Sequence, residues 1–169
     1  RLRRYGLRMS AEQVPSGMVT VQAVSAAVVG RVLAGKNLDR VLETALAEKP
    51  TLSGNERSAV HSISFDTLRH YGLLSAQLDT LLSQPVSDAT VRHLLLVALA
   101  QLQFSKAAAH AIVDHAVSAT EVMRYPRAKG LVNAVLRNFL RTPEKFKRER
   151  FKLDIATYDF PRWWIDRLK

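Results

Sequence analysis

The stretch that decides the fold reads Lys129-Gly-Leu-Val-Asn-Ala-Val-Leu-Arg-Asn-Phe-Leu-Arg141. On a helix, its apolar residues recur every three or four positions, which is the spacing of a buried stripe. The other side carries cations and amides and no carboxylate. We therefore predict an amphipathic helix over residues 129–141. Its buried stripe would consist of Leu131, Val132, Val135, Leu136, Phe139 and Leu140, and its polar row of Lys129, Asn133, Arg137 and Arg141, with Asn138 beside that row.

The polar row lies in a segment that contains no acidic residue. No Asp or Glu occurs between Glu121 and Glu144, although five Lys and Arg residues fall inside that interval. A solvated helix face usually mixes both signs of charge. One sign of charge combined with amide groups suits a phosphate backbone and exposed base edges. The competing interpretation is a charged surface without a specific partner. On the first interpretation the RNA-binding residues here are Arg127, Lys129, Asn133, Arg137, Asn138 and Arg141.

Composition indicates a single globular domain with a basic second half. The chain has 169 residues, 47% of them hydrophobic, and a mean hydropathy of -0.06, which allows a sizeable core. Its formal charge is +10 and its pI about 10.4. Residues 1–100 hold 11 Lys and Arg against 8 Asp and Glu, whereas residues 101–169 hold 14 against 7. This imbalance indicates a polyanionic partner, which could be RNA, DNA or an acidic membrane surface.

Cysteine is absent from the chain. Disulfides, thiol nucleophiles and cysteine-bound zinc are therefore excluded, and the composition fits a reducing compartment. No window has the unbroken apolar run of a membrane span, because Gln22, Ser25 and Arg31 interrupt the most apolar stretch. The sequence begins without Met and ends within an apolar-periodic run, so we expect it to be a fragment of a longer protein.

Local start and stop signals predict an all-α fold. The sequence shows no sustained alternation of strand type, no hairpin turn signal and no repeat period. Counting helix starts and stops gives about seven or eight helices. We expect the helix that Asp88 caps to be the central core helix, because its apolar periodicity is the cleanest in the chain. The residues that carry this periodicity are Val91, Leu94, Leu95, Ala98, Leu99 and Leu102. The signals are an N-cap at Ser16 with a stop at Gly35, an N-cap at Asn37 with a stop at Pro50, a capping box at Ser53 and Glu56, a bend or break at Gly72, an N-cap at Asp88, and a stop at Tyr125-Pro126.

The domain expected over residues 16–142 has a different kind of segment on each side. Residues 1–15 form a basic arm that either contacts RNA through counterion release or is an idle remnant. Residues 143–169 form a charge-dense linker that leads to Trp163 and Trp164. This tryptophan pair either stacks on bases or, as we favour, packs into a core or a domain seam. The arm's candidate RNA contacts are Arg1, Arg3, Arg4 and Arg8.

One compact group of residues could hold a metal or transfer protons. His110 and Asp114 are four residues apart and share a helix face, but His115 points roughly 100° away from Asp114. A metal site needs at least three converging ligands, so we favour ordinary polar residues at all three positions. The glycines show no phosphate-loop or dinucleotide spacing, and the serines lack a nucleophile-elbow context. We therefore predict no catalytic residue, no metal and no cofactor for this chain.

The stretch 129–141 closely resembles the signature helix of the NusB superfamily. Its members include the NusB antitermination factor and the N-terminal domain of Sun/Fmu-type ribosomal RNA cytosine-5 methyltransferases. Two features favour the methyltransferase branch. Arg137 stands where NusB factors tend to carry an acidic residue, and the segment through Pro161 and Trp163 resembles the one that leads out of the domain toward the methyltransferase. Ala108 and Asn37 depart from the usual Pro and Ser of the family. Four further segments agree with the family in order, at residues 34–38, 66–79, 110–111 and 160–164.

The resemblance implies a NusB-like helical bundle of two packed three-helix units with a C-terminal helical extension. It further implies an RNA-binding domain that positions ribosomal RNA for a methyltransferase. The catalytic domain and its S-adenosylmethionine would lie outside this chain, and the missing domain would be a second partner. No membrane and no sequence-specific DNA binding are expected, and the location would be cytoplasmic. Two alternatives stay open, namely a stand-alone antitermination adaptor and a metal-dependent enzyme that uses His110, Asp114 and His115.

Overall fold

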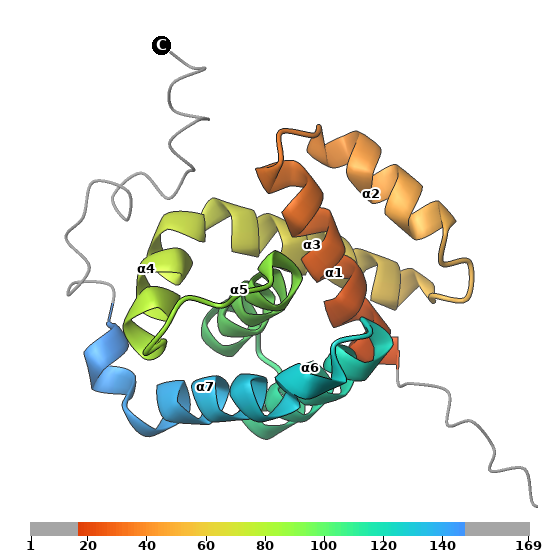
Figure 1. Ribbon diagram of the computed structural model, residues 1–169. Coiled ribbons are helices and arrows are strands. Elements are labelled where there is room, and N and C mark those ends of the chain that lie inside the picture. The colour runs from red at the N-terminus through yellow and green to blue at the C-terminus, as the bar shows by residue number, and fades with distance from the viewer. Residues whose placement is uncertain (1–16, 148–169) are drawn as a thin grey trace, which may run out of the picture.

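The computed structural model describes residues 17–147 of the chain (Figure 1). Among these residues there are seven α-helices, two 3-10 turns and no strand, which confirms the all-α prediction. The elements are α1 (Gly17–Leu33), α2 (Leu38–Ala47), α3 (Gly54–Arg69), α4 (Tyr71–Leu81), α5 (Ala89–Phe104), α6 (Ala109–Val122), η1 (Pro126–Ala128), α7 (Lys129–Arg141) and η2 (Pro143–Phe146). The arm residues Arg1, Arg3, Arg4 and Arg8 and the pair Trp163 and Trp164 lie outside the described residues.

Side chains at the predicted caps begin three of the helices. Asn37 accepts a hydrogen bond from the backbone N–H of Arg40 at 3.1 Å and begins α2. Ser53 and Glu56 form the predicted capping box of α3, with distances of 2.8 and 3.2 Å. Asp88 accepts from the N–H of Thr90 at 2.8 Å and begins α5. Each bond satisfies a backbone donor that the first turn of a helix leaves without a partner.

The break that was predicted at Gly72 lies two residues earlier. α3 ends at Arg69 and α4 begins at Tyr71, so Gly72 is inside the first turn of α4. The chain changes direction at His70, whose φ of -105° and ψ of 19° lie outside the helical range. This turn lets Leu74 and Leu78 of α4 reach the core, where both are fully buried. The position of the break thus depends on the burial of these two leucines. The glycine at position 72 gives no information about that burial.

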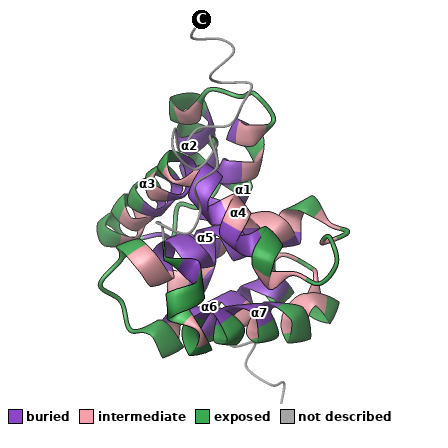
Figure 2. Ribbon diagram, turned by 90° about the vertical axis from the view of Figure 1, so that its left-hand side faces the viewer, coloured by how far each residue is buried: buried purple, intermediate pink, exposed green. Residues whose placement is uncertain are grey.

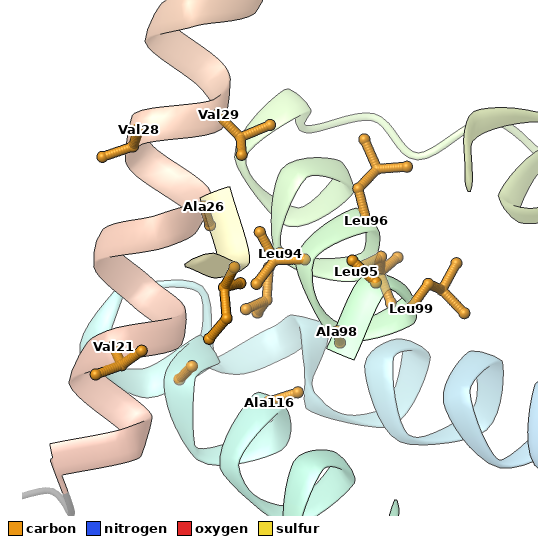
Figure 3. Close-up of a cluster of buried hydrophobic side chains, with 14 of the residues drawn as sticks. Val21, Ala26, Val28, Val29, Leu94, Leu95, Leu96, Ala98, Leu99 and Ala116 are labelled. Atoms are coloured by element: carbon orange, nitrogen blue, oxygen red, sulfur yellow. The ribbon is translucent and has the colours of Figure 1, made fainter. Parts of the chain in front are cut away.

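Helix α5 is the centre of the bundle, as its periodicity predicted. It packs against α1, α3, α4, α6 and α7, which surround it (Figure 1). In Figure 3, Leu94 lies on the side of α5 that faces α1, and Ala26 and Val29 lie on the side of α1 that faces α5. Each fully buried leucine side chain stabilises the fold by about 2 kcal/mol. The run from Leu94 to Ala100 is buried without interruption.

The described helices form one group of three, α1–α3, and one of four, α4–α7, where the resemblance implied two units of three. α1–α3 pack together, and α4–α7 gather around α5. Contacts of α1 with α5 and α6 join the groups. The second group includes α7 in addition to three other helices. Of the implied C-terminal extension, the described residues contain only the turn η2.

Hydrogen bonds between glutamine side chains connect α5 to α1 and to α4. Gln22 of α1 donates to Gln101 of α5 at 2.7 Å and to the carbonyl of Ile112 at 3.2 Å. Gln77 of α4 exchanges hydrogen bonds with Gln103 of α5 at 3.0 and 2.8 Å. These amides are costly to bury unless they are paired, so their bonds fix the relative positions of the helices.

Gln77 also fixes the end of the described chain. It donates to the carbonyl of Phe146 at 2.7 Å. The ring of Phe146 is buried, and its centroid lies 5.4 Å from that of Phe139 on α7. The turn η2 is therefore held against the bundle by one buried hydrogen bond and one aromatic contact.

His93 of α5 lies against the backbone of α1. A Cβ atom at Gly30 would come within 2.6 Å of its Nδ1 atom, so the absence of a side chain at Gly30 makes room for the ring. Burial lowers the pKa of His93 below its ordinary value of 6.5, and the neighbouring Arg92 lowers it further, while Asp88 acts in the opposite direction. The folded protein thus favours the neutral imidazole.

We expect His93 to contribute to a loss of stability in mild acid. Because its pKa is lower in the folded state, the unfolded chain binds the proton first as the pH falls below about 6.5, and the free energy of unfolding decreases. The variant His93→Gln should therefore lose less stability than the parent between pH 7 and pH 5, as measured by urea unfolding. His61→Gln, at an exposed position of α3, is the matched control. Equal pH dependence of the parent and His93→Gln would contradict this prediction.

Candidate nucleic-acid interface

The helix predicted over residues 129–141 is α7, with the same bounds. Its buried residues are Val132, Val135, Leu136 and Phe139, which pack against α5 and α6. The opposite side faces outward (Figure 2). Among the residues of the predicted RNA-binding row, Arg137 and Arg141 are exposed, and Lys129 and Asn133 are partly buried.

Two leucines of the predicted buried stripe are exposed instead. Leu131 is 40% exposed and Leu140 is 37% exposed. With 100° between successive residues, the four buried side chains occupy one narrow arc, and each leucine lies roughly 40° beyond an edge of it. The neighbouring helices cover only that arc, so the stripe is narrower than the sequence pattern suggested.

The polar row is less uniform in charge than the sequence predicted. Lys129 forms an ion pair with Glu121, which reaches it from the last turn of α6. The acid-free interval begins only after Glu121, and the chain reversal between α6 and α7 brings that carboxylate back to the start of the row. Lys129 is therefore partly neutralised, which corrects the prediction of a row without acidic neighbours.

Arg137 and Arg141 are exposed and have no carboxylate partner among the described residues, as the sequence predicted. Within residues 17–147, no carboxylate forms an ion pair with either guanidinium. Arg137 instead donates from Nε to Oδ1 of Asn133 at 2.8 Å. This bond orients the guanidinium and leaves its two terminal amino groups for another acceptor.

The remaining two predicted residues of this region face a groove rather than the row. Asn138 and Arg127 line a cavity of about 760 Å³ beside α7. One wall is the connection between α4 and α5, a second is the turn between α6 and α7, and the third is one side of α7. Its wall residues include Leu81–Asp88, Arg124–Ala128, Leu131, Ala134, Val135 and Asn138.

The groove contains residues that the sequence did not point to. Arg124 has a φ of 66°, the only positive value at a non-glycine residue in the described part of the chain. Tyr125 lies beside it and lines the same groove. The pKa of Asp88, which lies on another wall, is lowered mainly by the backbone N–H of Thr90 and further by the side chain of Tyr125. Tyr125-Pro126 predicted only the end of a helix, and no local signal placed Asp88, far earlier in the chain, across from it.

The structure gives no support to a metal site at His110, Asp114 and His115. His110 and Asp114 are exposed on α6, and His115 is partly buried. Within the described residues, no three His, Asp or Glu side chains are placed to hold a metal ion. Helix α6 begins after Ala108 without a side-chain cap. None of the helices that the structure describes is long and apolar enough to span a membrane.

Comparison with known proteins agrees with this geometry. A model of the NusB family matches residues 19–141, which include all of α7 and the walls of the groove. The chain is 38% identical over 141 residues to ribosomal RNA small subunit methyltransferase B of Pseudomonas syringae pv. tomato, a match that covers 82% of this chain and 31% of that protein. The proteins of the same name from Serratia proteamaculans and Vibrio cholerae are 30% and 29% identical over 152 and 155 residues, which cover 88% and 90% of this chain and 34% and 35% of theirs.

The chain thus spans about a third of the length of the curated relatives it matches. The family match extends over most of the chain and includes the stretch of residues 129–141 from which the resemblance was first inferred. On this ground the chain belongs to the NusB family.

Proposed function

We propose that this chain is an RNA-binding domain that positions ribosomal RNA for a methyltransferase. The observation that carries the proposal is the exposed face of α7, on which Arg137 and Arg141 have no carboxylate partner among the described residues. Two such guanidinium groups four residues apart lie about 6 Å apart along the helix axis. Unpaired arginines in this arrangement are suited to neighbouring phosphates of one strand.

The hydrogen bond that Arg137 donates to Asn133 supports this role. A free arginine side chain loses rotamer freedom when it binds a phosphate, whereas a side chain that is already oriented loses less. Because Asn133 occupies only Nε, the two terminal amino groups of Arg137 can still form the paired hydrogen bonds typical of arginine and phosphate. The amide therefore acts as a positioning group, not as a direct RNA contact.

The names of the relatives support the ribosomal RNA part of the proposal. Each relative continues well beyond the region that this chain matches. We assign the cytosine-5 methyl transfer and the binding of S-adenosylmethionine to a catalytic domain that residues 143–169 would lead to. The arginines of residues 1–15 would add positive charge to the RNA-binding surface. The protein would bind ribosomal RNA in the cytoplasm. Because these relatives are named as methyltransferases, we favour this function over a stand-alone antitermination adaptor.

Charge reversal on α7 should weaken RNA binding. For Arg137→Glu/Arg141→Glu we expect a loss of affinity for small-subunit ribosomal RNA of about tenfold or more, because two phosphate contacts become repulsive. The slope of log K against log salt should flatten by about 1.4, since each contact to a single strand contributes about 0.7. Filter binding or fluorescence anisotropy at several salt concentrations measures both quantities.

The control for this experiment is Arg31→Glu/Arg40→Glu. It makes the same change in net charge at exposed positions of α1 and α2, away from α7 (Figure 1). We expect it to reduce affinity much less. Equal losses in the two double variants, or an unchanged affinity of a folded α7 variant, would exclude α7 as the binding face.

Removal of the acidic neighbour of Lys129 should strengthen RNA binding. In Glu121→Gln the ion pair is lost and Lys129 becomes available to a phosphate, so we expect a gain in affinity of about two- to fivefold at low salt. The fold should tolerate the change, because an exposed ion pair contributes at most about 1 kcal/mol. Glu43→Gln, an equal charge change on α2, is the matched control. A gain that is no larger in Glu121→Gln than in Glu43→Gln would show that Lys129 does not contact the RNA.

A further inference from the structure

The described chain ends on α4, close to an aromatic ring that the fold leaves partly exposed. The carbonyl of Phe146 accepts a hydrogen bond from Gln77, and Gln77 exchanges hydrogen bonds with Gln103 at the end of α5. The residue after Gln103 is Phe104, which is 38% exposed. Lys147 then continues with an extended backbone, at a φ of -60° and a ψ of 138°. The chain thus leaves the bundle beside α4 (Figure 1), next to the end of α5.

A second ring already covers one face of Phe104. His70, which joins α3 to α4, stacks on it with ring centroids 4.1 Å apart and an interplanar angle of 23°. Phe104 is still one of the few exposed large hydrophobic residues of the described chain. Ala107 and Ala108, in the connection to α6, are also exposed and add apolar surface. A ring held in this way is a preformed site for another aromatic side chain, because stacked or tilted ring pairs are stabilised beyond the burial of their area.

The sequence that follows the described residues supplies an aromatic residue within reach of this ring. Gln77, where the chain leaves, and His70 are seven residues apart, which is about 10 Å along a helix. Phe151 follows Phe146 by five residues, and five extended residues span about 16 Å. The later aromatic residues, from Tyr158 on, would close a longer loop, which costs more entropy. Phe151 is therefore the first and least costly candidate to cover the ring.

We propose that residues 148–153 run back along α4 and place Phe151 on the exposed face of Phe104. The ring of Phe151 extends the stack that His70 and Phe104 begin. The surface at the end of α5 is thus a docking site for an aromatic segment of the same chain. Its effect is to fix the direction in which the chain continues from the bundle. The inference is independent of RNA binding, because it uses no residue of the polar row on α7.

Other exposed apolar side chains are less suited to this segment. The ring of Phe146 faces α7, whereas its carbonyl, from which the chain continues, faces α4. We therefore favour Phe104 over Leu140, which is exposed in the last turn of α7. Phe65 is more exposed than either, but it lines a separate cavity with Leu42 between α2 and α3.

The first test measures proximity in the full chain. The sequence contains no cysteine, so Lys106→Cys/Lys152→Cys has only the two introduced thiols, one near each ring, and keeps both rings. A short bismaleimide should cross-link this pair about fivefold or more faster than Ser62→Cys/Lys152→Cys, whose first thiol lies beside Phe65, because docking raises the local concentration of the thiols. Arg141→Cys/Lys152→Cys, beside Leu140, is the second comparison. A rate no higher than that of either comparison pair would overturn the inference.

The second test asks whether the rings cause the proximity. Adding Phe104→Gln to the Lys106→Cys/Lys152→Cys pair should lower its cross-linking rate to that of the comparison pairs. Adding Phe151→Gln, a change outside the described bundle, should lower the rate equally. Phe104→Tyr should leave the rate within about twofold, since it keeps the ring.

The matched control for the second test is Phe65→Gln, the same change at another exposed phenylalanine. We expect it to leave the cross-linking rate unchanged, and thermal melting by circular dichroism checks that each variant is folded. If a folded Phe104→Gln or the Phe151→Gln variant cross-links as fast as the unmodified pair, the rings do not hold the segment and the inference fails.

Discussion

The burial of α7 against α5 and α6 is the constraint on which the proposed RNA-binding surface depends. Four apolar residues of α7 occupy one narrow arc, and that arc leaves only one rotation of the helix about its axis. Once this rotation is set, Arg137 and Arg141 face outward and Leu131 and Asn138 turn toward the α4–α5 connection. A packing interaction without any charge thus decides where the charges of this helix are presented.

The electrostatics of that surface depend on chain reversal as well as on composition. Glu121 and Lys129 are far enough apart in sequence to belong to different helices, yet they meet because α6 and α7 are joined by a tight turn. The absence of acidic residues from the sequence interval therefore predicts the surroundings of the C-terminal part of α7 correctly. It does not predict the acidic neighbour of Lys129 at the start of the helix. Lys129 is the paired cation of the polar row, whereas Arg137 and Arg141 have no carboxylate partner among the described residues.

Sequence patterns predicted the parts of the molecule that depend on local chemistry. Asn37, Ser53 and Asp88 cap helices as expected, because capping involves residues only two or three positions apart. The exposure of Leu131 and the ion pair of Glu121 were not predictable in this way, since each depends on which neighbour covers which side of a helix. The groove was even less predictable from the sequence, because its walls come from three separated segments. A positive φ at Arg124 likewise has no signature in the sequence, where arginine at a helix end looks ordinary.

The anchoring of Phe146 has a mechanical consequence. Its carbonyl accepts a hydrogen bond from Gln77 and its ring packs against Phe139, so the last turn of the described chain is attached to the bundle at two points. Phe139 belongs to the same helix that presents Arg137 and Arg141. On the proposed function, RNA bound by Arg137 and Arg141 would keep a constant distance from Phe146, because α7 carries both arginines and the ring on which Phe146 packs.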